Sequence, residues 1–402
     1  MAAVRPRGGI VPLALQLSSF VLVLGMSDAI VGVLWPSMRH DLRLPLADLG
    51  LLSLSGSALY VAGGLAGDRV RSAITLGNTV LLACLLAVAS YGAWAAARLW
   101  AVVLVAFGAL GLSKGVLDAV VNAEAAVDGG MRRLGLIHAG WAVGGTLGPL
   151  VVAAVLVTSG DWRVAVAVAG AACLVVVVPL AFLDRTRPSA LGRAGGATPT
   201  ARLDGAGEAS TLSKPRRRAA LAGIVLANVA YVAAESAPIA WGYTYLTGGR
   251  HLGHVVAAAA VAGFWAGLTV GRLALAAIGD RFDGGRLLAA SCLLAVAGAL
   301  LLWLLPGAAS VAGFPIAGLG CAVYFPVLVA LTPKWVGTEH TGPAVGIAVA
   351  VSALGGPLAI SLFGLLAERL GVGVLGPCIA GAALLLLAVN HGVVALVRRV
   401  AL

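Results

Sequence analysis

Long apolar stretches, separated by short polar segments, follow one another along the entire chain. There are twelve of them, each close to 20 residues or longer, which is the length that an α-helix needs to cross a hydrocarbon core of roughly 30 Å. None alternates polar and apolar residues as a membrane-spanning strand would. The pattern predicts an all-α integral membrane protein with twelve transmembrane helices. We expect these helices at residues 11–36, 46–66, 73–94, 99–124, 134–157, 163–183, 219–246, 254–277, 287–305, 310–331, 342–366 and 372–397.

The composition excludes a soluble domain. Hydrophobic residues make up 60% of the chain and charged residues 11%, whereas soluble domains are about 45–50% apolar and about 25% charged. Arg5 and Arg7 precede the first apolar stretch as they would in a signal peptide. That stretch, however, continues past Trp35 without a small-residue cleavage site. We therefore expect it to remain as the first helix.

A basic segment that contains several prolines and glycines divides the twelve stretches into six and six. We expect a cytoplasmic tail at 1–10, a six-helix half at 11–183, a cytoplasmic basic linker at 184–218, a second half at 219–397 and a cytoplasmic tail at 398–402. The halves are pseudo-symmetric, because the pair Asp68-Arg69 after the second stretch matches Asp280-Arg281 after the eighth. Such halves predict a transporter whose substrate site lies between them, near the middle of the membrane.

The net charge of +11 does not indicate a nucleic-acid partner, because most lysines and arginines fall on one side of the predicted membrane. The positive-inside rule then places both termini and the linker in the cytoplasm of a multi-pass protein in the inner or plasma membrane. The basic cluster from Lys214 to Arg218 is expected to hold the end of the linker near anionic lipid.

The twelve spans, the basic linker and the repeated Asp-Arg signature resemble the major facilitator superfamily (MFS) of transporters. Four segments resemble, more narrowly, the branch of that superfamily that contains fucose permease. These segments are GMSDAIVGVLWP, GLSKGVLDAVVNAEAAV, LIHAGWAVGG and YVAAESAPIAWGYTYL. In that branch an acid on helix 1, and an acid four residues before an asparagine on helix 4, serve sugar recognition and proton coupling. The resemblance implies these roles for Asp28, Asp118 and Asn122.

Four ionisable residues lie deep inside the predicted spans, where a charge is costly and therefore indicates function. They are Asp28, Lys114, Asp118 and Glu235. Lys114 can neutralise one acid, which leaves two acids without a partner if all are ionised. Burial disfavours the ionised form of a carboxyl group, so at least one acid is expected to carry a proton part of the time. We predict proton coupling through Asp118 first, with Asp28 and Glu235 as alternatives.

Lys114, Asp118 and Asn122 are spaced four residues apart and share one face of the fourth helix. We predict that this face lines the substrate site. The alternative is an ion pair between Lys114 and Asp118 that only orients the helix. His138, on the fifth helix, is a further candidate substrate contact, with a structural hydrogen-bonding role as its alternative.

The seventh predicted helix carries a second polar face. Asn228, Tyr231, Glu235 and Pro238 recur on it at near-helical spacing, and Trp241 follows about one turn later. We predict that the residues other than Pro238 contact the substrate, chiefly through Glu235, and that Pro238 provides a kink. The alternative is a cluster of hydrogen bonds between helices.

A charge network is predicted at the cytoplasmic helix ends, where it would hold that side closed in the outward-facing state. The alternative is surface charge without a gating role. The predicted gate residues are Asp68, Arg69, Glu124, Arg132, Asp280 and Arg281.

These features predict a secondary active transporter, proton-coupled, that moves a small polar solute such as a sugar by alternating access. We expect a monomer surrounded by membrane lipids. Proton-driven efflux of a drug or metabolite is an alternative, although only four methionines and 6% aromatic residues weigh against an aromatic export site. A non-transporting membrane sensor with the same fold is an alternative of another class. Without a phosphate-binding loop, a catalytic cluster or metal-ligand spacing, we expect no enzyme activity, no metal and no cofactor.

Overall fold

The computed structural model describes residues 13–74, 76–128, 130–186, 214–278 and 281–401. Helices are the only regular secondary structure in this part of the chain, and twelve of its helical segments are long and apolar enough to cross a membrane. Each of the twelve overlaps one of the stretches predicted from the sequence. The predicted fold class is therefore confirmed.

The first half of the chain forms six of these spans. The first span combines α1 (Leu13–Ser19), the π-helix η1 (Phe20–Gly25) and α2 (Met26–Leu42). The others are α3 (Asp48–Ala73), α4 (Leu76–Ala96), α5 (Trp100–Asp128), α6 (Gly130–Ser159) and α7 (Trp162–Thr186).

The second half forms the remaining six spans, with short helical turns between some of them. In chain order they are α8 (Lys214–Thr244), the π-helix η3 (Tyr245–Gly249), α9 (His254–Ile278), α10 (Gly284–Leu304), the 3₁₀-helix η5 (Gly307–Ala312), α11 (Gly313–Val336), α12 (Thr338–Leu370), the 3₁₀-helix η6 (Val372–Val374) and α13 (Leu375–Ala401).

The helices extend into both ends of the expected linker. We placed the linker at 184–218, but α7 continues to Thr186 and α8 already begins at Lys214. Pro215 is compatible with this start, because proline is favoured in the first turn, where a helix needs no backbone N–H donor. The three arginines that follow it are good helix formers. The basic cluster is therefore the first turn of α8 and not part of a tether.

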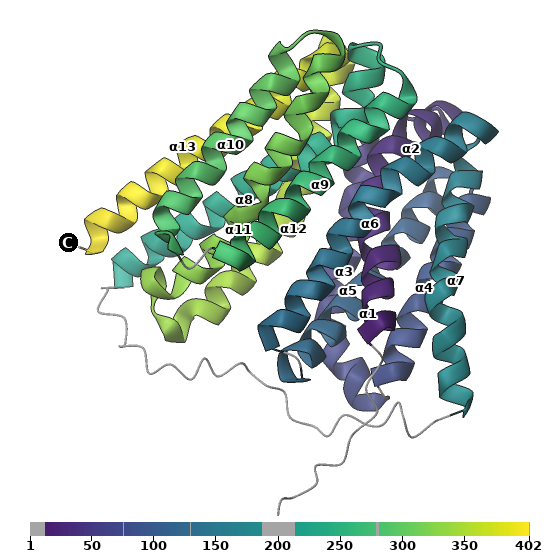
Figure 1. Cartoon of the computed structure of the whole chain (residues 1–402), viewed down its shortest axis with the longest axis horizontal. Coiled ribbons are helices and arrows are strands. Elements are labelled where there is room, and N and C mark those ends of the chain that lie inside the picture. The colour runs from purple at the N-terminus through teal and green to yellow at the C-terminus, as the bar shows by residue number, and fades with distance from the viewer. Residues whose placement is uncertain (1–12, 75, 129, 187–213, 279–280, 402) are drawn as a thin grey trace, which may run out of the picture.

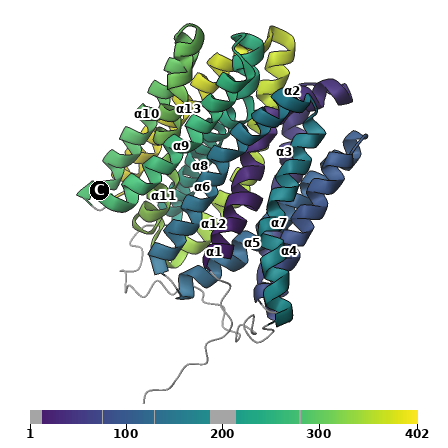
Figure 2. The same cartoon turned by 45° about the vertical axis from the view of Figure 1, so that its right-hand side comes forward.

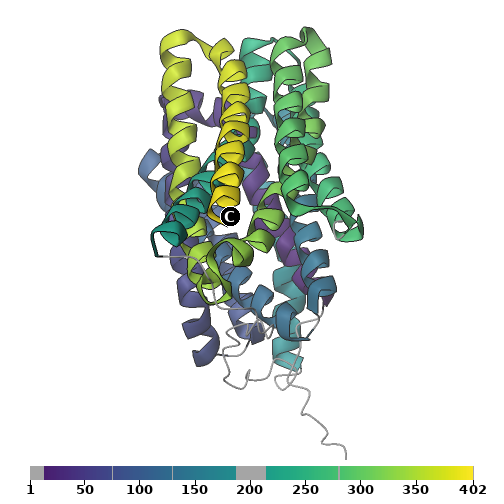
Figure 3. The same cartoon turned by 90° about the vertical axis from the view of Figure 1, so that its left-hand side faces the viewer.

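The two halves form separate bundles that converge at one end of the molecule and diverge toward the other (Figure 1). We call the diverging end the linker end, because α7 ends and α8 begins there, and the opposite end the far end. The halves contact each other through α2 with α8, α3 with α12 and α6 with α9. The outer helices α4 and α7 lie along one edge (Figure 2), and α10 and α13 lie together on the opposite side (Figure 3).

Glycines bring the halves into backbone contact at the far end. A Cβ atom on Gly32 of α2 would meet the carbonyl oxygens of Ile239 and Ala240 on α8, and one on Gly364 of α12 would meet the backbone at Ala47. The backbone N–H of Ala47 also donates a hydrogen bond of 3.0 Å to Glu368. Small residues allow such close helix approach in membranes, where packing replaces the hydrophobic effect as the force between helices. The far end is therefore tightly closed.

The apolar residues are distributed as expected for a protein in a membrane. Aromatic side chains such as Trp94, Trp265 and Phe264 are almost completely buried between helices. Large apolar side chains on the outer helices, by contrast, remain exposed, as at Val175 of α7 and Leu293 of α10. Such a surface matches lipid chains, so the bundle interior is left to the polar groups described next.

Candidate substrate and proton site

Asp28, in the middle of the first span, is held by donors from two other helices. Lys114 of α5 forms an ion pair with its Oδ1 atom, and the indole N–H of Trp141 on α6 donates a hydrogen bond of 2.9 Å to its Oδ2 atom. The side chain of Lys114 is 11% exposed and that of Asp28 is 33% exposed. The carboxylate is therefore neutralised by contact yet still partly open to the space around it.

The ion pair corrects one alternative that the sequence left open. Lys114 and Asp118 share a face of α5, but the lysine pairs with Asp28 and not with Asp118. The reason is geometric, because α2 brings an acid close to the lysine from a neighbouring helix. Lys114 thus joins two helices and does not merely orient α5.

Asp118 has its own set of donors one turn further along α5. The phenol of Tyr60 on α3 donates a hydrogen bond of 2.7 Å to Oδ2, and the amide of Asn122 donates one of 2.9 Å to Oδ1. The helices α3 and α5 can approach because Gly115 has no side chain, and a Cβ atom there would collide with the backbone of Tyr60. The glycine spacing on α5 thus positions the tyrosine at the acid.

Glu235 is the corresponding acid of the second half, and one phenol binds it. Tyr231, one turn earlier on α8, donates a hydrogen bond of 2.6 Å to Oε1 of Glu235. The tyrosine ring in turn stacks on Tyr324 and Phe325 of α11, with ring centroids 5.4 Å and 6.2 Å away. The stacking holds the Tyr231 phenol in place, and the hydrogen bond from this phenol in turn orients Glu235.

The other two residues predicted on this face of α8 lie elsewhere. The amide of Asn228 donates to the Ala348 carbonyl and to Ser352 at 2.6 Å, and Trp241 donates to the Ile360 carbonyl. All three partners are on α12. Asn228 is 1% exposed and Trp241 0%. For these two residues the geometry favours the alternative of hydrogen bonds between helices over substrate contact.

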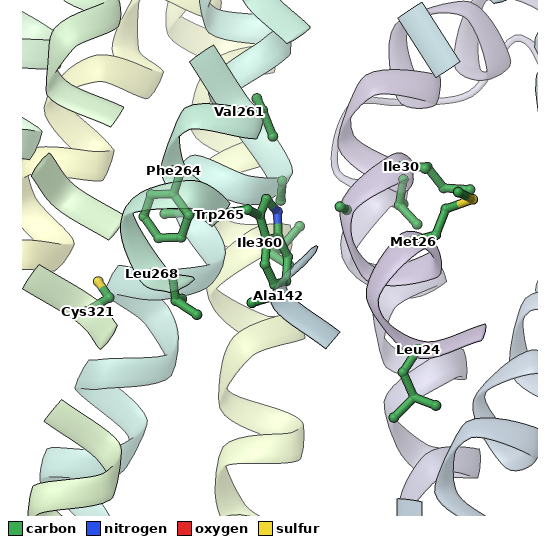
Figure 4. Close-up of a cluster of buried hydrophobic side chains, with 14 of the residues drawn as sticks. Leu24, Met26, Ile30, Ala142, Val261, Phe264, Trp265, Leu268, Cys321 and Ile360 are labelled. Atoms are coloured by element: carbon green, nitrogen blue, oxygen red, sulfur yellow. The ribbon is translucent and has the colours of Figure 1, made fainter. Parts of the chain in front are cut away.

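Side chains of α6 and α9 meet between the two halves. The Arg272 guanidinium carbon lies 4.7 Å from the ring centre of Trp141, and the Trp265 ring packs edge-on against the same indole at 4.8 Å. Figure 4 shows Trp265 on the side of α9 where Ala142 of α6 lies, whereas Phe264 points toward Cys321. Trp141 therefore touches Asp28 in its own half and Arg272 in the other half.

The charge of Arg272 also acts on two of the predicted site residues. Glu235 of α8 and His138 of α6 both lie within its electrostatic reach. His138 is half-buried, stands edge-on to Phe20 and lies within reach of the Asp118 charge. The predicted residues Asp28, Lys114, Asp118, Asn122, His138, Tyr231 and Glu235 are thus brought to one region around the meeting of the halves.

Sequence reasoning missed Tyr60, Trp141 and Arg272 as members of this site. Arg272 gave a signal, because it interrupts the apolar span His254–Leu275, but its place near a helix end suggested a peripheral position. Trp141 gave only its spacing of three residues from His138, and Tyr60 gave none, since aromatic residues are common in apolar spans. Only the packing of α3 on α5 and of α6 on α2 brings them to the acids.

The gate prediction concerns residues that are only partly described. The side chains of Asp68, Glu124 and Arg132, and the whole of Asp280, lie outside the part of the chain that the structure describes. Arg69 and Arg281 are exposed. Within the described residues no group of three or more histidine, cysteine, aspartate or glutamate side chains is arranged to hold a metal ion.

Two six-helix halves, with ionisable groups gathered where they meet inside the membrane, define a transporter of the two-half class. The chain belongs to the Major Facilitator Superfamily, whose family model matches residues 17–314. No curated relative matches the chain.

Solved structures of transporters share this fold. A bacterial homolog of the human lysosomal transporter Spinster, in an inward-facing and occupied conformation, is 15% identical with a TM-score of 0.67, over 97% of this chain and 96% of that chain. A peptide transporter in complex with alafosfalin is 15% identical with a TM-score of 0.71, over 96% and 95%. The nucleoside transporter NupG is 13% identical with a TM-score of 0.73, over 96% and 99%.

Proposed function

We propose that the protein is a proton-coupled secondary active transporter that moves a small polar solute, such as a sugar, by alternating access. The observation that carries this proposal is Asp118. It is an acid inside a membrane span that has two neutral hydrogen-bond donors, Tyr60 and Asn122, and no contacting cation among the described residues. A carboxyl held in this way can gain or lose a proton without breaking an ion pair, which suits a proton carrier.

The arrangement of the halves supports alternating access. If the linker end faces the cytoplasm, as the distribution of lysine and arginine indicates, the divergence of the bundles toward that end corresponds to an inward-facing state. The glycine contacts at the far end would then be the closed extracellular side. Rocking the halves about the central polar groups would close one end and open the other.

The choice of a polar solute rests on the polar faces of α2, α5 and α8 and on their resemblance to the fucose permease branch. Asn122, Tyr231 and Glu235 offer hydrogen-bond acceptors and donors of the kind that bind hydroxyl groups. The peptide and nucleoside transporters share the fold at 15% and 13% identity, which supports the two-half architecture.

The test is uptake into proteoliposomes of the purified protein, screened over sugars, with and without an imposed proton gradient. Replacing Asp118 by asparagine keeps the shape and removes the titratable proton. Asp118→Asn should abolish accumulation driven by the gradient, while exchange of internal for external solute can survive. The matched control is Asp283→Asn, because Asp283 is an exposed N-cap of α10 and asparagine caps a helix about as well. Normal accumulation with unchanged pH dependence in Asp118→Asn would reject this residue as the proton carrier.

Two alternatives give different results in the same vesicles. Proton-driven efflux of a drug or metabolite would appear as solute movement opposite in direction to the proton flow, from the linker end to the far end. A sensor with this fold would bind a solute, shown by a shift of the melting temperature, without any flux. Neither has a structural observation in its favour comparable to the polar faces.

A further inference from the structure

Arg272 is a cation inside a membrane span for which the described residues supply no carboxylate in contact. Its guanidinium stacks on Trp141, and its Nε atom is buried without a hydrogen-bond partner. Arginine stays protonated in proteins and can only donate hydrogen bonds. A buried donor of this kind costs free energy unless an acceptor completes it. The site therefore lacks an acceptor, and a negatively charged one fits best.

A second donor on the same helix is in the same situation. The indole N–H of Trp265 is buried and has no acceptor within the described part of the chain, and an indole nitrogen can also only donate. Trp265 and Arg272 are seven residues apart on α9, which places them on one face two turns apart. Both contact the ring of Trp141. Two donors without acceptors thus flank one aromatic surface between the halves.

The acids of the site are already occupied by other groups. Asp28 has Lys114 and Trp141, and Asp118 has Tyr60 and Asn122. Glu235 accepts from Tyr231, and although the charge of Arg272 acts on it, the two make no ion pair. Arg272 as a whole is only half-buried, so part of its side chain remains accessible to a ligand. The missing acceptor is therefore best supplied by the solute.

We propose that Arg272 binds the carboxylate of the transported solute, and that the solute is a small monocarboxylate such as a hydroxy acid or a sugar acid. This rests on the proposed function and narrows its substrate class. The planar guanidinium matches a carboxylate with two parallel hydrogen bonds. One carboxylate neutralises one arginine, whereas a phosphate monoester would bring a charge of about −1.5 to −2. Lys114 does not bind the solute carboxylate, because it already forms an ion pair with Asp28.

The experiment uses matched pairs of acid and neutral compounds on the full-length protein in detergent. The probes are galacturonate with galactose, and lactate with lactamide, with galactose 6-phosphate as the phosphate arm. Binding is measured by the shift of the melting temperature and as a Kd. The variants are Arg272→Gln, which removes the charge, and Arg272→Lys, which keeps the charge without the planar fork. Arg286→Gln, an exposed arginine in the first turn of α10, is the control.

The acid of at least one pair should stabilise the parent protein, and its neutral partner should not. Arg272→Gln should weaken binding of that acid by at least about tenfold, since a hydrogen bond to a charged group is lost. Arg272→Lys should weaken it less, and Arg286→Gln should leave it unchanged. Melting temperatures without ligand verify that each variant is folded.

Three outcomes would overturn the proposal. The first is that no acid of the panel shifts the melting temperature. The second is that the neutral compounds or the phosphate bind as well as the carboxylates, and the third is an unchanged Kd for the acid in Arg272→Gln. Proton-driven uptake of a neutral sugar alone would reject the carboxylate and leave the proposed function standing. Binding of an acid at Arg272 without any flux into vesicles would do the opposite, because the anion site would hold and the transporter would not.

Discussion

The two halves hold their buried acids in different ways. In the first half Asp28 and Asp118 each have two donors from their own half, and one of these is the ammonium group of Lys114. In the second half Glu235 has the phenol of Tyr231, while Arg272 reaches across to Trp141 in the other half. The acids of the first half therefore take their hydrogen-bond donors from within that half. Arg272 of the second half contacts Trp141 of the first half, so a rocking motion of the two halves changes the environment of this charge.

The largest effect is expected from removing the cation of the first half. Lys114→Gln should lower the apparent free energy of unfolding by about 2–4 kcal/mol, between the values for a fully buried pair and for an exposed one, because Asp28 then stays in the membrane without its cation. The measurement is denaturant unfolding in lipid–detergent micelles. The double variant with Asp28→Asn should recover most of the loss. A single variant as stable as the parent would show that the pair does not hold α2 to α5.

The corresponding change in the second half should act on binding more than on stability. Glu235→Gln should weaken binding of the transported solute by more than tenfold, since a hydrogen bond to a charged group contributes about 1.5–3 kcal/mol. The affinity is measured on purified protein with the solute identified by uptake. Tyr231→Phe, which removes only the phenol O–H, separates loss of the acid from loss of its support. An unchanged affinity in Glu235→Gln would leave this residue as a packing group.

Trp141 belongs to both arrangements, and two substitutions divide its roles. Trp141→Phe removes the N–H that donates a hydrogen bond to Asp28 but keeps a ring beside Arg272. Because Asp28 is charged, this variant should lower the free energy of unfolding by about 1.5–3 kcal/mol. Trp141→Leu also removes the ring and should lose a further 0.5–1 kcal/mol or so of cation–π attraction. Equal melting temperatures for the two variants would mean that Arg272 gains nothing from the ring.

The smallest expected effect lies at the linker end, away from both clusters. If Asp68 and Arg69 lock that side as the sequence predicts, Asp68→Asn should remove about 1 kcal/mol, near the upper end for exposed pairs. The ratio of inward-open to outward-open molecules would then rise about fivefold. Cysteines introduced at the linker ends of α3 and α9 should react faster with a water-soluble maleimide in this variant. Equal rates together with unchanged transport would assign the pair to topology alone.

The fold was predictable from the sequence because length and apolarity alone decide what crosses a membrane. Twelve stretches of sufficient length leave little choice of secondary structure. The linker differs from the prediction only at its ends, where α7 continues to Thr186 and the basic residues begin α8 at Lys214. The glycines on α5 could be recognised as packing positions. The sequence did not reveal which residue faced each of them.

The site was predictable as a set of residues and not as a set of partners. A charge inside an apolar span is visible in any sequence, so Asp28, Asp118 and Glu235 could be named. Their partners come from other helices, at sequence separations of 86 residues for Lys114 and 58 for Tyr60, and no local pattern encodes such distances. Trp241 shares the polar spacing of α8 yet binds the Ile360 carbonyl, because the position of α12 decides which side of a helix is interior.

The π-helical turn at Phe20–Gly25 has a consequence for comparing sequences. A turn with i→i+5 hydrogen bonds holds one more residue than a regular turn, so it shifts everything after it by one position, or about 100° around the axis. Upstream of the turn α1 packs on α6 and α7, and downstream α2 packs mainly on α6 and α8 and less on α7. An alignment of related chains therefore needs a one-residue gap between Phe20 and Gly25 wherever a homologue lacks the insertion. Without that gap the column of Asp28 would hold residues from the wrong side of the helix.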